Sequence, residues 1–321
     1  MTARTLSLGT RGSRLALVQA EWVAAALRAA VPGLEVRLRT ISTEGDRVQS
    51  PLPEALPSWG LGVFARDIEA ALLRGEIDFA VHSLKDLTAE LPAGLAIAAV
   101  PAREDPSDVL VTLDGRRLDD LPCDARVGTS SLRRAAFLRA YRPDLQPVAL
   151  RGNVDTRWRK LLDPGQGYDA IVLAAAGLVR LGLDEAPRWA IPHEVLLPAP
   201  GQGALALEAR EDDKETRALL AAVNDPPTAR AVRAERRVLR DLEGGCRLPV
   251  SALGTALPDG ALRLAGAVAA PDGARVIRVA LTGELKEPEA LGAALASRLL
   301  EMGARELLEA AAGAETVGPA R

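Results

Sequence analysis

Short apolar runs alternate with amphipathic segments through roughly the first 200 residues of the chain. In the first amphipathic segment Leu15, Val18, Trp22 and Leu27 share one helical face, which predicts a helix that buries this face. The predicted strands are 6–8, 36–41, 78–81, 95–100, 148–150 and 170–173, with another at Val127. The predicted helices include 67–73 and 132–140, with others ending at Leu162 and Leu181. This alternation is typical of a parallel sheet with helices on both faces.

The pattern of strands and helices begins twice, which predicts two α/β domains. Proline-containing stretches at 101–106 and 198–203 suit two crossings between them. A third part of the chain has a helix at 228–242, strands at 262–268 and 275–281 and a last helix at 287–302, which indicates a small α+β domain. We therefore expect domain 1 to comprise 1–102 and 201–224, domain 2 to comprise 103–200, and domain 3 to comprise 225–321.

Composition narrows the class of protein. The chain has 321 residues, of which 48% are hydrophobic and 26% charged, so two or three domains can each bury a core. A net charge of -3 does not suggest a nucleic-acid partner. No apolar run approaches the ~18 residues of a membrane span. With two cysteines, two histidines and no secretory signal, we expect a cytoplasmic monomer without a disulfide framework or a zinc site.

Arginine and hydroxyl residues recur just after the predicted strands, where open α/β sheets bind ligands. A helix that begins there offers free N–H groups to an anion, although Ser, Thr and Asn are also ordinary N-caps. Arginine in a first turn opposes the helix dipole, so several such arginines favour a ligand with many negative charges. The residues concerned are Arg11, Ser13, Thr129, Ser130, Ser131, Arg133, Arg134, Arg151, Asn153, Thr156, Arg157 and Arg180.

One carboxylate, Asp86, follows the predicted strand at 78–81. It could cap a helix. Among so many cations it could instead stabilise a developing positive charge or deliver a proton.

A reachable thiol is predicted further along the chain. Cys246 follows Gly244 and Gly245 and precedes Arg247, a composition typical of an exposed turn. The neighbouring arginine favours the thiolate, which is the nucleophilic form of cysteine. A turn that merely contains a cysteine is the alternative.

Seven runs resemble the porphobilinogen deaminase family, also called the hydroxymethylbilane synthase family, and they occur in the order found there. They are Thr10-Arg11-Gly12-Ser13 with Leu15-Ala16-Leu17 and Gln19; His82-Ser83-Leu84-Lys85-Asp86; Val127-Gly128-Thr129-Ser130-Ser131-Leu132-Arg133-Arg134; Leu150-Arg151-Gly152-Asn153-Val154; Ala175-Ala176-Gly177-Leu178; Pro200-Gly201-Gln202-Gly203-Ala204; and Glu243-Gly244-Gly245-Cys246. The matches extend from residue 10 to residue 250, and the last 70 residues are less distinctive.

The resemblance implies a fold class: two α/β domains like those of type II periplasmic binding proteins, plus a smaller C-terminal α+β domain. It also implies a dipyrromethane cofactor on a thioether to Cys246. The enzyme would join four porphobilinogen units head to tail with loss of ammonia, and water would release hydroxymethylbilane.

Roles carried over from the family make Asp86 the catalytic residue. The cofactor-binding residues implied are Cys246, Lys85, Asp86, Thr129, Ser130, Ser131, Arg133, Arg134 and Gly152. The substrate-binding residues implied are Arg11, Ser13, Gln19, Arg151, Arg157 and Arg180. Porphobilinogen is then the small-molecule partner, with no metal, nucleic acid or membrane.

The sequence departs from the family at Leu61, where a lysine is expected, so a lysine role there does not transfer. Cys123 matches no motif, and we interpret it as structural. Two other classes of protein stay open: a non-enzymatic anion-binding or sensor module of the periplasmic-binding type, and a cysteine-dependent transferase that forms a thioester. The first leaves Cys246 and the third domain unexplained, and the second leaves the arginines unexplained.

Overall fold

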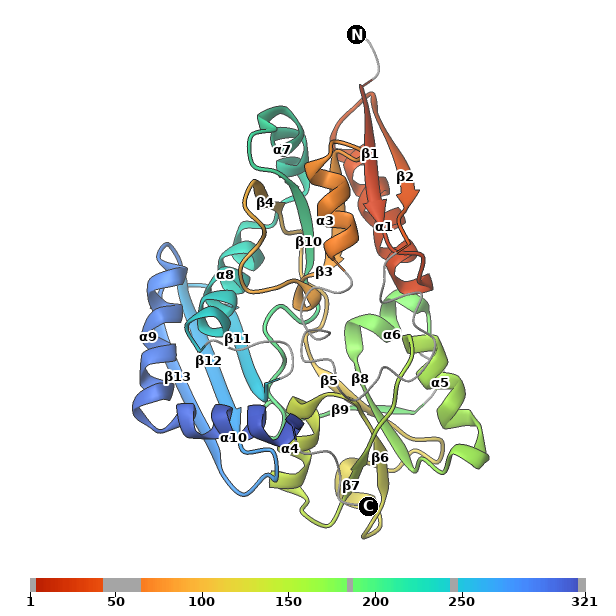
Figure 1. The fold of residues 1–321 in the computed structure, drawn as a ribbon, viewed down its shortest axis with the longest axis vertical. Helices are drawn as coiled ribbons and strands as arrows, with labels where there is room; N and C mark the ends of the chain where they lie inside the picture. The colour runs from red at the N-terminus through yellow and green to blue at the C-terminus, as the bar shows by residue number, and fades with distance from the viewer. Residues whose placement is uncertain (1–3, 43–64, 184–186, 243–247, 317–321) are drawn as a thin grey trace. The chain divides into compact units, whose positions relative to one another are not determined.

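The computed structural model describes residues 4–42, 65–183, 187–242 and 248–316. Cys246 and Leu61 lie outside these ranges. The chain divides into two compact units, which are described separately below: unit 1 is 1–104 with 204–230, and unit 2 is 105–203 with 231–321 (Figure 1). Within the described ranges, no helix has the length and apolar character needed to cross a membrane.

Unit 1 contains a five-stranded sheet with the order β2-β1-β3-β10-β4. The strands are β1 (Arg4–Thr10), β2 (Leu34–Thr40), β3 (Phe79–Ser83), β4 (Leu95–Ala99) and β10 (Leu205–Arg210). The first three run parallel, whereas β10 pairs antiparallel with β3 and β4. The expectation of a purely parallel sheet was therefore wrong. The cause is β10, which the sequence pattern did not predict and which enters between two earlier strands.

Helices cover both faces of this sheet. They are α1 (Arg14–Ala30), α3 (Arg66–Leu73) and α7 (Lys214–Leu220), and a short 3-10 helix, η1 (Leu84–Asp86), follows β3. Phe79 and Val81 pack with α1, whereas Ala80 packs with α3, as strand alternation requires. The predicted face of α1 is only partly buried: Leu27 is buried, whereas Trp22 is 51% exposed. Ala20 and Val23 are buried beside Leu27.

Unit 2 contains a second five-stranded sheet with the order β7-β6-β8-β5-β9. The strands are β5 (Asp108–Val111), β6 (Arg126–Gly128), β7 (Gln146–Val148), β8 (Ala170–Ala174) and β9 (Arg188–Ala190). Strands β6, β7 and β8 are parallel, and β5 is antiparallel to both of its neighbours. This sheet is also mixed, because β5 runs against the other four strands. The pattern predicted neither β5 nor β9. Strand β7 begins and ends two residues earlier than predicted.

Three helices pack on the second sheet: α4 (Leu132–Tyr141), α5 (Val154–Leu162) and α6 (Ala175–Leu181). Phe137 of α4 shares a core with Val127 and Val172 on one face. Leu161 and Leu178 share another core with Ile171 on the opposite face. Helices therefore cover both faces, as the sequence predicted.

A smaller α+β domain follows within unit 2. It contains the antiparallel sheet β11-β12-β13, with strands β11 (Val250–Ala256), β12 (Ala261–Ala269) and β13 (Val276–Glu284), and helices α9 (Pro288–Glu301) and α10 (Ala304–Thr316). Helix α9 lies so close to α8 (Pro226–Asp241) that a Cβ at Gly292 would lie 2.6 Å from the carbonyl oxygen of Ala234. Two α/β sheets covered by helices and this smaller α+β domain confirm the predicted α/β architecture.

Candidate active site

Unit 1 brings four predicted site residues to one edge of its sheet. Strands β1 and β3 are parallel neighbours, so their carboxyl ends meet at the same edge. Arg11 and Ser13 follow β1, and Lys85 and Asp86 lie in η1 directly after β3. A cationic turn and a carboxylate therefore share this edge.

Asp86 does not cap the helix in which it lies. It is the third residue of η1, whose N-cap is Ser83. Asp86 is exposed, and its carboxylate forms no hydrogen bond or ion pair within the described part of the chain. A carboxylate in this state can act on a bound ligand.

Two other predicted residues of unit 1 have structural partners. The Ser13 hydroxyl accepts a hydrogen bond from the Ala16 N–H at 3.4 Å, so it caps α1, and this does not exclude a ligand contact. Gln19 is only 4% exposed, and its side chain lies against Ser83. Gln19 is thus a buried residue of α1, not an exposed residue at the edge of the sheet.

In unit 2, three helices begin at the carboxyl ends of three parallel strands. The loop after β6 is joined to the loop after β7 by Ser130, whose hydroxyl donates to the Leu150 carbonyl at 2.9 Å and accepts from the Leu150 N–H at 3.1 Å. The Ser131 hydroxyl caps α4 by accepting from the Arg134 N–H at 3.4 Å. The Thr129 hydroxyl accepts from the Ser131 N–H at 3.2 Å. These hydroxyls hold the loops in shape.

The start of α5 differs, because its N-cap Asn153 makes no side-chain capping bond. Gly152 has φ of +117°, and a Cβ there would lie 2.7 Å from Cγ2 of Thr156. Only glycine fits this backbone without strain. Because Gly152 has no side chain, the backbone just before α5 is uncovered, and an anionic group could come close to the N–H groups of the first turn.

Three predicted arginines of unit 2 differ in exposure. Arg151 is exposed, and its guanidinium has no partner among the residues that the structure describes. Arg157 donates from Nε to the Gly152 carbonyl at 2.8 Å, and Arg180 donates from Nη2 to the Gly203 carbonyl at 2.7 Å. Both are half-buried. The two carbonyl bonds help to orient these side chains.

Arg133 and Arg134 are buried and share one carboxylate. Arg133 Nη2 lies 2.6 Å from Oδ2 of Asp108, and Arg134 Nη2 lies 2.7 Å from Oδ1. Burial alone would raise the pKa of Asp108, but the two guanidinium groups outweigh it and hold the pKa at about 2. Asp108 is therefore a counter-ion within the protein for both arginines, so their place in the first turn of α4 does not by itself require a bound anion. The two arginines and Asp108 together still carry one excess positive charge.

Sequence reasoning missed Asp108 and did not assign Gln202. The Gln202 side-chain nitrogen donates to Asp108 at 3.1 Å and to the Pro106 carbonyl at 2.7 Å. Asp108 directly precedes the apolar run 109–111. An aspartate at the start of a buried strand requires a partner, and this feature of the sequence could have identified Asp108 as part of the site.

A second buried cluster lies in unit 1 between α3 and the sheet. It contains Glu69, His82 and Glu208, and His82 Nε2 lies 3.0 Å from Oε2 of Glu208. Burial and then the charge of Glu208 raise the pKa of Glu69, His82 and Arg66 oppose the shift, and the result is a pKa of about 7. Glu69 therefore holds a proton near neutral pH. The sequence reasoning gave these three side chains no role.

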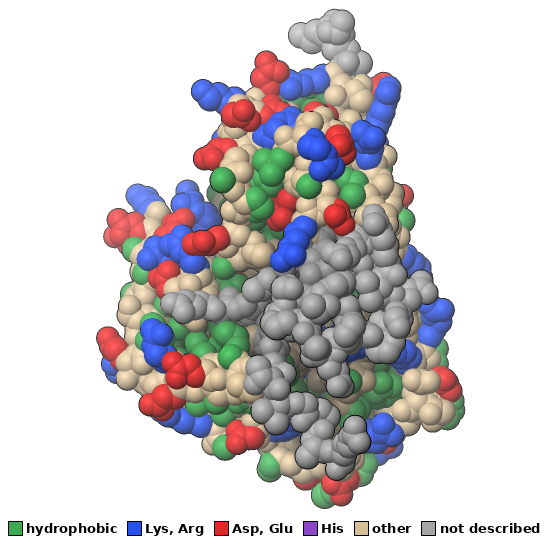
Figure 2. Space-filling view, viewed as in Figure 1, with side chains coloured by type: hydrophobic (Ala, Val, Ile, Leu, Met, Phe, Trp, Pro, Cys, Tyr) green, Lys and Arg blue, Asp and Glu red, His purple; other side chains and the backbone are tan. Residues whose placement is uncertain are grey.

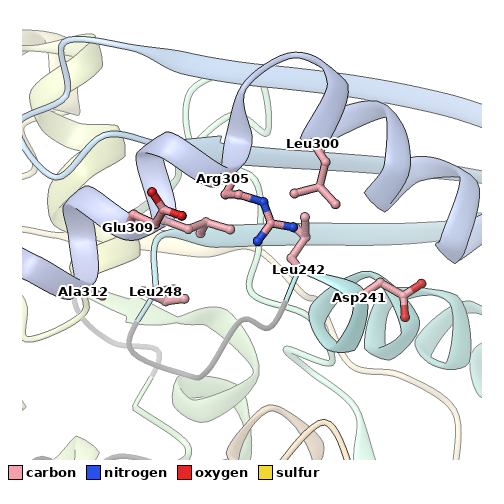
Figure 3. A pocket seen from close by; sticks show the side chains of 8 residues that line it. Asp241, Leu242, Leu248, Leu300, Arg305, Glu309 and Ala312 are labelled. Carbon is pink, nitrogen blue, oxygen red and sulfur yellow. The ribbon is translucent and has the colours of Figure 1, made fainter.

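A pocket of about 210 Å³ is lined by residues on both sides, in the sequence, of the segment 243–247 that contains Cys246 (Figure 3). Leu242 and Leu248, the last and first described residues on either side of that segment, both line it. Its other lining residues are Asp241, Leu300, Arg305, Leu308, Glu309 and Ala312. Because Cys246 itself lies outside the described residues, its role stays a prediction. Cys123 is an exposed free thiol.

Among the described residues that Figure 2 shows in colour, acidic and basic side chains are interspersed. Among the described residues, no group of three or more His, Cys, Asp or Glu side chains could hold a metal ion. The candidate chemistry therefore rests on one carboxylate, several arginines and the predicted thiol.

The fold and these residues define a class: a protein of two α/β domains that carries anion-binding groups at the carboxyl ends of its strands. Two family models match the chain. They are "Porphobilinogen deaminase, dipyromethane cofactor binding domain" at residues 6–218 and "Porphobilinogen deaminase, C-terminal domain" at residues 229–301. The chain belongs to the porphobilinogen deaminase family.

Similar proteins cover nearly the whole chain. The porphobilinogen deaminase of Desulforudis audaxviator is 53% identical over 306 residues, which are 95% of this chain and 97% of that protein. The porphobilinogen deaminase of Thermus thermophilus is 51% identical over 307 residues, which are 95% of this chain and 98% of that protein. Among solved structures, an arginine-specific periplasmic binding protein from Salmonella typhimurium aligns with a TM-score of 0.40 and 16% identity, covering 73% of this chain and 98% of that one.

Proposed function

We propose that Asp86 is the catalytic carboxylate of a porphobilinogen deaminase reaction, with the arginines at the strand ends as carboxylate-binding groups and Cys246 as the cofactor attachment point. The reaction itself follows from family membership. Four porphobilinogen units are joined head to tail with loss of ammonia, and hydrolysis releases hydroxymethylbilane. The enzyme is thus a transferase of tetrapyrrole biosynthesis.

The observation that carries the role of Asp86 is its free, exposed carboxylate beside Lys85 at the sheet edge. When ammonia leaves porphobilinogen, the substrate ring becomes an electrophilic cation that arginines alone would repel. A carboxylate beside the ring N–H stabilises that cation and can take up the proton released as the new bond forms. Asp86 is suited to both tasks.

The residues present fit a dipyrromethane group. Each of its two rings carries an acetate and a propionate, and arginine binds carboxylates through charge-assisted hydrogen bonds. Gly152 leaves bare backbone at the start of α5, and Arg151 offers an unpaired guanidinium nearby in the chain. When bound, the cofactor supplies the ring carbon to which the first substrate unit is joined.

We propose the following holders of the cofactor: Cys246, Lys85, Asp86, Thr129, Ser130, Ser131, Arg133, Arg134 and Gly152. The Thr129, Ser130 and Ser131 side chains support the loops, and the excess positive charge of Arg133 and Arg134 attracts the carboxylates. Arg11, Ser13, Arg151, Arg157 and Arg180 hold the carboxylates of the substrate and of the growing chain.

We also infer a three-domain division at 1–102 with 201–224, 103–200 and 225–321. The three separate sheets support this division. We expect a cytoplasmic monomer whose partner is porphobilinogen, without nucleic acid or membrane.

Intact mass and Ehrlich's reagent test the attachment. The purified chain should exceed its sequence mass by one dipyrromethane, react with the reagent and carry the adduct on the peptide that contains Cys246. Cys246→Ser should lack the adduct and nearly all activity, because a serine hydroxyl is a poor nucleophile at its ordinary pKa. Cys123→Ser is the matched control and should keep both. An adduct on Cys123, or full activity of Cys246→Ser, would contradict the assignment.

A further inference from the structure

Gln19 and Ser83 form a contact that joins the two turns of the unit 1 edge. The Ser83 Oγ lies 3.1 Å from Nε2 and 3.2 Å from Oε1 of Gln19, although the two residues are 64 positions apart in the chain. The hydroxyl can accept from one amide atom or donate to the other. The contact is therefore satisfied in either orientation of the amide.

Each partner belongs to an element that carries a proposed active-site residue. Gln19 lies on α1, six residues after the N-cap Ser13 and so roughly 9 Å further along the helix axis. Ser83 ends β3 and is the N-cap of η1, the turn that holds Lys85 and Asp86. The contact thus links the start of α1 to the turn of Asp86.

The Ser83 hydroxyl does not cap η1, although Ser83 is the N-cap residue of that helix. An N-cap serine ordinarily accepts from a backbone N–H of its own helix, yet Ser83 makes no such bond. The other side of η1 is held by the Leu84 N–H, which donates to the Ala204 carbonyl at 3.0 Å. The turn is thereby fixed between β10 on one side and α1 on the other.

Burial argues that Gln19 acts through Ser83. Gln19 is 4% exposed, whereas Asp86, three residues beyond Ser83, is exposed. A buried amide satisfied by a protein hydroxyl is poorly placed to recognise a substrate. It is well placed to fix a backbone turn, since a catalytic group must be held within a fraction of an ångström of its working position.

We propose that Gln19 is a positioning residue: through Ser83 it fixes the Asp86 turn relative to the anion-binding turn of Arg11 and Ser13. This inference rests on the proposed catalytic role of Asp86. It replaces direct substrate binding by Gln19, which the family resemblance implied, with an action through the Ser83 hydroxyl.

The test is a double-mutant cycle with Gln19→Met, which has nearly the same volume but cannot form the bond, and Ser83→Ala. Each variant should lower kcat by about 10- to 100-fold, because a small displacement of Asp86 misplaces the charge, while KM changes by less than about 2-fold. The double variant should be no slower than the slower single variant, because both remove the same contact. Ser83→Thr keeps a hydroxyl and should recover most of kcat.

Arg28→Met is the matched control on the same helix. Its guanidinium donates to the Val36 carbonyl at 2.7 Å, far along α1 from the edge. This variant should lose some thermal stability and keep kcat. If Gln19→Met lowered Tm as Arg28→Met does and left kcat unchanged, Gln19 would be only a structural residue.

Direct substrate binding by Gln19 predicts another result: a raised KM in Gln19→Met and additive effects with Ser83→Ala. Either that result or an unchanged kcat would overturn the proposal. Asp86→Asn, assayed alongside, separates this failure from failure of the proposed function. An active Asp86→Asn would remove the basis for both, whereas an inactive Asp86→Asn with a normal Gln19→Met would overturn only the positioning role.

Discussion

Arg133 donates from Nη2 to Oδ2 of Asp108 across 2.6 Å, with both side chains almost fully buried. Arg134 occupies the other carboxylate oxygen, and Gln202 adds a further hydrogen bond. The first turn of α4 thus carries two cations against the helix dipole, and Asp108 offsets much of that cost. The group is an electrostatic unit in which no member can be removed without leaving a buried charge or polar atom unpaired.

Asp108→Asn should destabilise the protein by about 3–5 kcal/mol, since it leaves two buried guanidinium groups without a counter-ion. The folded-state pKa of Asp108, about 2, is below its ordinary value of 3.8. Its contribution to stability is therefore present above about pH 4 and is lost as the pH falls through about 2. Urea unfolding at neutral pH measures the loss. The control Glu215→Gln removes an exposed partner of Arg4 and should cost under about 1 kcal/mol; equal costs for the two variants would contradict this account.

Glu69→Gln should abolish one pH-dependent component of stability. The pKa of Glu69 is raised from 4.5 to about 7 in the folded protein, so the folded state holds a proton that the unfolded state releases. Stability from this group is complete below about pH 4.5 and is lost as the pH rises to about 7. The groups that set the shift are Glu208, His82 and Arg66.

Urea midpoints of wild type and Glu69→Gln, compared at about pH 5 and about pH 8, measure this component. The stability of the variant relative to wild type should increase at the higher pH. Glu21→Gln, an exposed change on α1, should leave the pH profile unchanged. Parallel profiles for wild type and Glu69→Gln would show that Glu69 keeps an ordinary pKa.

Arg151→Leu and Arg133→Leu should fail in different ways. Arg151 is exposed and its guanidinium has no partner in the described part of the chain, so loss of the side chain should leave Tm unchanged while elongation stalls at one chain length. Loss of Arg133 removes half of the counter-charge of Asp108, so stability and cofactor assembly should both fall. Mass spectrometry of trapped intermediates counts the rings. Arg263→Leu, an exposed change on β12, is the control. A common product distribution with only a raised KM would rule out ring-specific arginines.

Asp86→Asn should slow elongation by about 10²–10³, the usual loss when one preorganised charge is removed from a site. Asp86→Glu keeps the charge but moves it by a methylene group, so part of the activity should survive. Both variants are assayed after checks of folding and of cofactor on Cys246. Glu90→Gln, an exposed carboxylate four residues away, should elongate normally. A nearly normal rate in folded, cofactor-loaded Asp86→Asn would exclude the catalytic role.

Local sequence determined much of this protein. Apolar periodicity predicted the ends of β8, α4 and α9 to within one residue and those of β1 and β3 to within two, because burial on one face leaves a repeating signal along the chain. It also placed Asp86 after a strand of the first sheet and Arg151 after a strand of the second, and within each sheet parallel pairing brings such positions to one edge. The seven family motifs are likewise local runs. They identified the family without any knowledge of contacts.

Tertiary structure alone decided which side chains meet. Strand β10 inserts antiparallel between the earlier strands β3 and β4, and β5 pairs antiparallel with the later strands β8 and β9. A short apolar run does not encode its neighbours or its direction. Asp108 finds Arg133 from 25 positions away, and Gln19 finds Ser83 from 64. Each is an ordinary polar residue in the sequence. Its role arises only when chain folding excludes water around the pair, because burial is what turns a polar side chain into one that must have a partner.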